Sequence, residues 1–416
     1  MKKIIAAVVL SALCLPAMAV ENAVLSFYQR QAVSKGTTSK QDRAFAAALA
    51  RDVAEWVRIN PQDPEVKTAL LMQADYYLRA REEANALLAL YKVRFYFPSD
   101  SDVTLLSSNI EVAMEELNRS EKGQALKLLA VDTGTLPSLD QRKAALLENL
   151  VKADLSKIYQ PVCELFEDFF AQYPRYNHTD KLTLLYGDWH RQNGNFLAAV
   201  TEYKKVNELM AQTTYKAASL RMTADVYASD LKEYETAMTL YNQVLKQYPN
   251  SSERGIVYKH MAVLEENQKN YASSITYYGK AIADLGMQNI AYDAWTGKAD
   301  VLIKTKQYQA AYDTLLQGAA VFSREEEKYV TLLSRAAEVA ARKMKDPVQQ
   351  ATALDQALLT YPQTQRAPQM MYELAQAYER ADKPLQALAV YKRLILQFPT
   401  DKYASKAQGR VNKLEK

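Results

Sequence analysis

Apolar positions along most of this chain recur at helical spacing, in pairs of short segments. In residues 368–399 this spacing predicts two amphipathic helices folded back on each other. Small residues, where two backbones can approach closely, alternate there with aromatic residues that fill the space beside them: Ala375, Tyr378, Ala387 and Tyr391. The second helix should end at Phe398-Pro399, because proline cannot continue a helix and biases the preceding residue away from it.

Prolines mark the ends of such units at a nearly constant interval. They stand at Pro61, Pro98, Pro137, Pro174, Pro249, Pro362 and Pro399. Successive intervals are 37, 39, 37, 75, 113 and 37 residues, and the two long ones are two and three steps of roughly 37.5. Five of the prolines follow an aromatic residue: Phe97, Tyr173, Tyr248, Tyr361 and Phe398. A fixed period of this size indicates a solenoid of stacked helix pairs.

The helix-pair pattern is clear in some units and weak in others. Each clear unit places a small residue in its first helix and an aromatic residue in its second; the clear units are 70–98, 182–206, 220–249, 258–281 and 295–315. Over about 105–175 and 325–362, helix length and period alone support the pattern.

This arrangement resembles the tetratricopeptide repeat (TPR), as it occurs in periplasmic proteins of bacteria. The resemblance implies an all-α fold: a right-handed α-α superhelix (solenoid) of about nine to ten TPR-like helix pairs with a C-terminal capping helix. Family repeats typically have 34 residues and these have about 37–39, so turns or helices should be longer. The expected order is a signal peptide over 1–19, N-terminal helices over 20–60, degenerate TPR-like repeats over 61–174, TPR-like repeats over 175–400 and the capping helix over 401–416.

The last segment has the composition that the end of a solenoid needs. Its apolar positions fall on one helical face: Tyr403, Ala407, Val411 and Leu414. Five basic residues remain for the opposite face. A terminal helix with a polar outer face keeps a repeat array soluble, although the basic run could instead meet an anionic partner.

Composition supports an all-helical protein. The chain has 416 residues, 49% of them hydrophobic, and only 11 glycines. It also has 28 tyrosines, most of them at the packing positions of the repeats. The repeat pattern does not require Tyr176, Tyr292 and Tyr372, which could stack on sugars or peptide side chains.

The first nineteen residues indicate export. A basic start is followed by an apolar run from Ile4 to Leu15 and by the small-x-small site Ala17-Met18-Ala19, which predicts a bacterial secretory signal cleaved after Ala19. The alternative, a lipoprotein anchored through Cys14, would need a small residue in place of Leu13. No later apolar run reaches the 18 or more residues of a membrane helix, so no membrane span is expected in the mature chain.

The mature chain would keep one cysteine and little net charge. Cys163, in an apolar context, is interpreted as a core residue; a reactive thiol or an intermolecular disulfide is the alternative. The formal charge of +4 falls to about +2 without Lys2 and Lys3, which gives no electrostatic case for nucleic acid.

The sequence offers no constellation of catalytic residues. It lacks a phosphate-binding glycine loop, an HExxH motif, paired-cysteine zinc spacing and a glycine-flanked nucleophilic serine. The three histidines, His178, His190 and His260, are isolated in the sequence, and His190 is interpreted as a packing residue beside Trp189. We therefore expect no enzyme activity, no cofactor and no metal site.

The resemblance implies a binding surface on the first helix of each repeat, where the family binds peptide segments. Transferred by register, that surface comprises Asp188, Arg191, Arg221, Asp225, Lys259, Asp300, Tyr372 and Gln376. The row mixes signs, and the Lys/Asn clamp that some members use on a terminal carboxylate is not reproduced.

The expected function is therefore a non-catalytic periplasmic scaffold that binds other cell-envelope proteins through its concave groove. The resemblance is to proteins of outer-membrane assembly, Tol-Pal or TonB systems, without a choice among them. A solenoid that handles polysaccharide or peptidoglycan is the first alternative. An enzyme with a helical ring around a catalytic domain is the second, but no segment longer than about 40 residues is left for such a domain.

Overall fold

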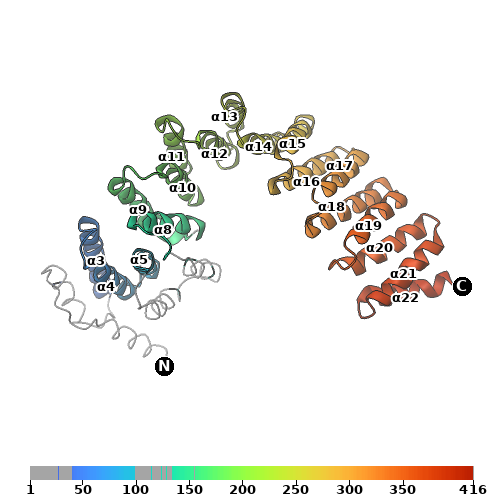
Figure 1. Ribbon diagram of the computed structural model, residues 1–416, viewed down its shortest axis with the longest axis horizontal. Coiled ribbons are helices and arrows are strands. Elements are labelled where there is room, and N and C mark those ends of the chain that lie inside the picture. The colour runs from blue at the N-terminus through green and yellow to red at the C-terminus, as the bar shows by residue number, and fades with distance from the viewer. Residues whose placement is uncertain are drawn as a thin grey trace. The chain divides into compact units, whose positions relative to one another are not determined.

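The computed structural model is helical throughout the part of the chain that it describes, residues 27, 40–98, 114, 123, 128, 134–153 and 155–415 (Figure 1). This part contains eighteen α-helices. The chain divides into two compact units, one up to Val226 and one from Tyr227. We call them unit 1 and unit 2 and describe each by itself.

Unit 1 contains the helices α3 Lys40–Ile59, α4 Val66–Ala80, α5 Glu83–Tyr96, α8 Leu139–Ala153, α9 Tyr159–Gln172, α10 Thr179–Gln192, α11 Phe196–Leu209 and most of α12 Lys216–Ser229. A short 3-10 turn, η1 Ser156–Ile158, precedes α9. The core is rich in large aromatic side chains that are fully buried: Tyr76, Tyr91, Phe95, Phe166 and Trp189. Burial of such large apolar surfaces stabilises this unit.

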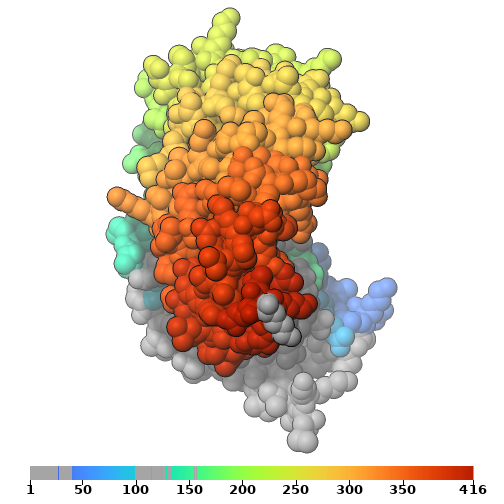
Figure 2. All heavy atoms as spheres, turned by 90° about the vertical axis from the view of Figure 1, so that its right-hand side faces the viewer, coloured from blue at the N-terminus to red at the C-terminus, as the bar shows by residue number. Residues whose placement is uncertain are grey.

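Unit 2 contains α13 Tyr234–Gln247, α14 Glu253–Asn267, α15 Tyr271–Leu285, α16 Asn289–Lys304, α17 Tyr308–Val321, α18 Glu326–Val339, the π-helical turn η2 Ala340–Met344, α19 Pro347–Thr360, α20 Ala367–Arg380, α21 Pro384–Gln397 and α22 Lys402–Leu414. From α13 onward each helix packs against the next in the chain. Figure 2 shows this succession at the surface, where the colour passes from yellow to red in chain order. In α20 and α21 the predicted contact residues Ala375, Ala387 and Tyr391 are fully buried.

Five helices end at an aromatic-proline step, all in the same backbone conformation: α5, α9, α13, α19 and α21. All five aromatic residues are C-caps, with φ between −125° and −133° and ψ between 57° and 72°. The amide N–H of each donates to the carbonyl four residues earlier, at 2.8 to 3.0 Å. The following proline then stops the helix, because it has no N–H to continue the ladder. The prediction that these prolines mark equivalent joints is confirmed within each unit.

A second repeated feature lies in the turn between the two helices of a pair. One residue there has positive φ, between 55° and 78°: Arg81, Gly194, Lys232, Lys269, Lys306, Lys345 and Asp382. After five of them, the next amide donates to a carbonyl five residues back, as Asn270 does to Glu265 and Gln307 does to Leu302. This is the Schellman pattern, which satisfies helix-end carbonyls and normally uses glycine. Only one of the seven positions is glycine.

The α-α solenoid fold is confirmed, and within the two units the described residues contain seven helix pairs. The helix α22 buries Ala404, Ala407 and Val411 against the preceding repeat, as expected for a cap. Several predicted parts lie outside the described residues. These are the signal peptide over 1–19 with Cys14, residues 20–39 of the N-terminal helices apart from the exposed and helical Phe27, and most of 99–133. The proposed domain boundaries and the right hand of the superhelix stay predictions.

Candidate partner-binding surface

Four of the eight predicted site residues come together on two helices of unit 1, α10 and α12. Asp188 and Arg191 lie on α10, and Arg221 and Asp225 lie on α12. Arg221 and Asp225, four residues apart, form an ion pair with 17% and 8% of their side chains exposed. The charges of Arg191, Arg221 and Asp225 all act on the Asp188 carboxyl, so the four residues form one electrostatic cluster.

A glycine contact positions this cluster. A Cβ on Gly187 would lie 2.4 Å from the ring of Tyr203, so the absence of a side chain lets α10 and α11 approach closely. Tyr203 is fully buried, and its hydroxyl donates to Asp188 Oδ1 at 2.6 Å. Burial raises the pKa of Asp188, although the Tyr203 bond and the two arginines act in the opposite direction. Asp188 is thus held in place from its own helix pair.

Unit 2 carries the other four predicted residues, and its ion pairs link successive first helices. Lys259 of α14 lies 3.2 Å from Asp293 of α16, and Asp300 of α16 pairs with Arg335 of α18. Asp293 and Asp300 keep 61% and 49% of their side chains exposed. Exposed ion pairs contribute only about 0–1 kcal/mol, so a charged partner can replace one of them at little cost.

The last two predicted residues lie on α20, where Tyr372 is part of an aromatic group. Its ring centroid is 5.6 Å from those of Tyr391 and Tyr403. Gln376 lies one turn further along α20 and is half-buried. All eight residues chosen from the repeat register therefore lie on the first helices of their repeats. That a partner protein binds them stays a prediction.

The tyrosines considered as sugar-stacking platforms are half-buried and packed. Tyr176 meets Phe169 edge-on at 5.2 Å in unit 1. Tyr292 meets Phe322 edge-on at 5.8 Å in unit 2. Tyr372 contacts the two rings named above. These contacts account for the three rings as packing residues, and no specific observation favours glycan binding.

The histidines and the cysteine have structural surroundings. His190 is buried, and its Nδ1 lies 2.8 Å from the Tyr159 hydroxyl, which confirms its interpretation as a packing residue. Cys163 is buried, and burial raises the pKa of its thiol, which disfavours the reactive thiolate. His178 is exposed and comes directly before α10. Among the described residues, no group of three or more His, Cys, Asp or Glu could hold a metal ion. Nor is any described helix both long enough and apolar enough to cross a membrane.

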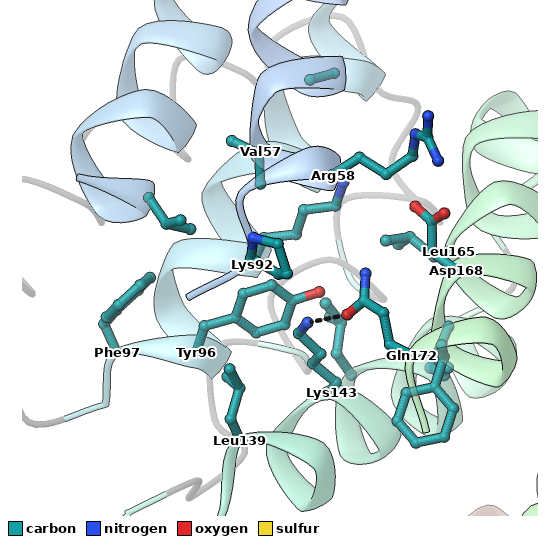
Figure 3. Close-up of a pocket in the computed structure, with 16 residues that line it drawn as sticks. Val57, Arg58, Lys92, Tyr96, Phe97, Leu139, Lys143, Leu165, Asp168 and Gln172 are labelled. Carbon is teal, nitrogen blue, oxygen red and sulfur yellow. Dashed lines mark hydrogen bonds between the residues drawn. The ribbon is translucent and has the colours of Figure 1, made fainter. Parts of the chain in front are cut away.

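Sequence reasoning missed a cleft in unit 1 that contains two lysines (Figure 3). Lys92 comes from α5 and Lys143 from α8, and Asp168 of α9 lies across from them. The two lysines are 51 residues apart in the sequence, and Lys143 falls in the stretch where the repeat pattern is weak. No local motif could have brought them together.

Repeated antiparallel helix pairs with the same joints and turns define a class, the α-α solenoid proteins. Within that class, the sequence model of the tetratricopeptide repeat matches residues 218–251 and 369–401. These two segments contain the α12–α13 and α20–α21 pairs almost entirely. The chain therefore contains tetratricopeptide repeats in these two segments.

Several solved structures are similar to the chain, at low identity. The C-terminal part of a TPR repeat-containing protein from Cytophaga hutchinsonii has 14% identity over 64% of this chain and 98% of that one, with a TM-score of 0.43. The apo form of RapI has 13% identity over 67% and 82%, with a TM-score of 0.41. A tetratricopeptide repeat protein from Parabacteroides merdae has 14% identity over 66% and 100%, with a TM-score of 0.34. No curated protein sequence matches the chain.

Proposed function

We propose that this chain is a non-catalytic scaffold of the bacterial periplasm that binds other cell-envelope proteins through the first helices of its repeats. Its tetratricopeptide repeats support the general role of a protein-interaction scaffold. The periplasmic setting rests on the N-terminal sequence, with its basic start, apolar run and Ala17-Met18-Ala19 site.

The observation that carries the binding role is the charged cluster on α10 and α12. Arg221 and Asp225 are mostly buried, and Asp188 is held by a buried tyrosine, so the cluster presents fixed charges instead of mobile ones. Prepositioned charges lose little side-chain entropy on binding and discriminate between partners by sign. A partner segment with complementary charges fits this surface.

The main experiment separates partner recognition from the internal role of the ion pair. Arg221→Glu and Asp225→Lys each break the pair, whereas the double variant restores an ion pair four residues apart with reversed sign. Proteins bound in intact cells would be crosslinked, recovered through the tagged chain and quantified by mass spectrometry. Lys204→Glu, at an exposed position of the second helix α11, is the matched control.

We expect both single variants and the double variant to lose the same partners, at least tenfold, while the control retains them. Circular dichroism should show that the double variant is folded. If the double variant recovers its partners at the wild-type level, the charges have only a structural role and the proposed surface is wrong. If all variants recover them, the partner binds elsewhere.

The location is tested independently. We expect the mature protein in the periplasmic fraction, with an N-terminus at Val20 that mass spectrometry can identify. Retention in the cytoplasm with an intact N-terminus would contradict the location without bearing on the α10–α12 surface.

A further inference from the structure

The cleft in unit 1 lies among α3, α5, α8 and α9 and offers about 70 Å³ to water-sized molecules (Figure 3). Ten of its sixteen lining side chains are apolar, among them Leu146 and Leu165. A second cleft of about 220 Å³ adjoins it and shares Arg58, Lys92 and Asp168 with it. Together their linings are about half apolar and carry charged groups of both signs, which suits a small molecule with a charged end and an apolar end.

Lys92 contributes a positive charge that has no partner at ion-pair distance among the described residues. Its amine has no hydrogen bond or ion pair with any described residue, although Asp168 and Glu164 attract it from a greater distance. Burial lowers the pKa of Lys92 to about 8, so the amine is still largely protonated at neutral pH. Lys92 is half-buried, so its amine has lost part of its hydration without gaining a close counter-charge, and an anion bound beside it would compensate for that loss.

Lys143 provides a second amine on the same cleft, also without a negatively charged partner at ion-pair distance. Its Nζ donates to the neutral amide oxygen of Gln172 at 2.8 Å, the contact dashed in Figure 3. The same amine lies 5.4 Å from the ring centre of Tyr96 and 5.3 Å from that of Tyr173. Burial lowers the pKa of Lys143 as well, and Asp168 opposes that shift.

The charged groups on α3 and α9 leave the two amines available. Arg58 is engaged with Glu55 on its own helix, with Nε at 2.7 Å from Oε2. Asp168 has no described hydrogen-bond or ion-pair partner, and burial raises its pKa. Neither of the two carboxylates that attract Lys92, Asp168 and Glu164, lies at ion-pair distance from it, and that of Asp168 is itself partly desolvated.

We propose that this cleft binds a small organic carboxylate, whose charged end is held by the amines of Lys92 and Lys143 and whose apolar end lies against Leu146 and Leu165. The hydroxyl of Tyr96, which points toward Lys143 in Figure 3, is a further donor. The apolar lining disfavours inorganic phosphate, which is polar on every side. This site does not involve the charged surface of α10 and α12, so it does not rest on the proposed scaffold function.

The test is isothermal titration of the full mature chain with hexanoate, its neutral analogue hexanamide, and phosphate. We expect saturable binding of hexanoate and none of the other two probes. Lys92→Gln should weaken hexanoate at least tenfold, because a charged hydrogen bond is lost. Lys152→Gln is the matched control, since Lys152 lies on α8 with 67% of its side chain exposed. Lys143→Gln should also weaken binding.

A stability measurement distinguishes a ligand-binding lysine from a structural one. Lys92→Met removes the partly desolvated charge and keeps the length of the side chain, so it should raise the melting temperature of the ligand-free protein while abolishing hexanoate binding. Equal binding of hexanoate and hexanamide, equal losses in the Lys92 and Lys152 variants, or no hexanoate binding would overturn the proposal.

Discussion

Two glycines in adjacent helices of unit 2 should respond in opposite ways to the same substitution. Gly297 lies in α16, and a Cβ there would lie 2.6 Å from both Cζ and the hydroxyl oxygen of Tyr278. Gly279 lies in α15, and a Cβ there would meet nothing within 4 Å. Both residues are helical, so alanine should improve the local backbone by about 1 kcal/mol at either position.

The contact with Tyr278 decides the sign at position 297. The Tyr278 ring is 3% exposed, and its hydroxyl lies 3.3 Å from Glu266 Oε2, so the ring cannot move away without a loss of packing. Overpacking of this kind costs about 1–3 kcal/mol. When the gain in helix propensity of about 1 kcal/mol is subtracted from this cost, Gly297→Ala should be destabilising by about 0–2 kcal/mol. Gly279→Ala, which meets no neighbour, should be stabilising by about 1 kcal/mol.

The assay is native-state hydrogen exchange followed by mass spectrometry, because a chain of two units need not unfold in one step. Peptides from α14, α15 and α16 should exchange faster in Gly297→Ala and more slowly in Gly279→Ala. Gly279→Ala is the matched control for helix propensity. If both variants slow exchange equally, the close contact between α15 and α16 does not exist as described and the reasoning fails.

Three further predictions concern a turn, a buried histidine and the cap. Lys306→Gly should stabilise the chain by about 1 kcal/mol, because positive φ is strained for lysine but not for glycine. Chemical denaturation would measure the change in the free energy of unfolding, and a loss of stability would contradict the prediction. Burial lowers the folded-state pKa of His190, so the free energy of unfolding should fall as the pH drops below the unfolded pKa of 6.5. His190→Gln, which changes the contact with Tyr159, should make the melting temperature depend less on pH between pH 5 and 7. An unchanged pH dependence would refute this. Arg410→Met should speed hydrogen exchange in α22, because Arg410 Nε donates to the mostly buried Glu379 at 3.0 Å. A charged hydrogen bond of this kind contributes about 1.5–3 kcal/mol. Unchanged exchange would show that the apolar face alone holds the capping helix.

The fold was predictable because its joints use residues with strong backbone preferences. Proline after a half-buried aromatic residue ends a helix wherever it occurs, so Pro98 and Pro399 revealed the period without any knowledge of packing. The turns within each pair were not predictable in the same way. Positive φ at Lys269 or Lys306 is imposed by the helix-end hydrogen bonds, and lysine carries no sequence signal for that conformation.

The candidate site was predictable in position but not in energetics. Register placed Asp188 and Arg221 on first helices that prove to be neighbours. Arg221 and Asp225 are four residues apart, a spacing that allows the ion pair they form on α12. The hydrogen bond from Tyr203 to Asp188 depends on the missing side chain of Gly187, which becomes meaningful only when the two helices are packed together. The Lys92–Lys143 cleft depends on contacts between distant segments and therefore left no trace in the sequence.

The repeated turns and joints have a consequence for how this chain can grow or shrink. In unit 2 the positive-φ residues follow one another at 37, 37, 39 and 37 residues, and the extra two residues coincide with the π-helical turn η2. Because η2 takes up the surplus length, α19 still ends in the same aromatic-proline joint as α21. Gain or loss of a whole module should therefore leave its neighbours in register, and a π-turn offers a way to absorb the small insertions that would otherwise rotate every later helix out of phase.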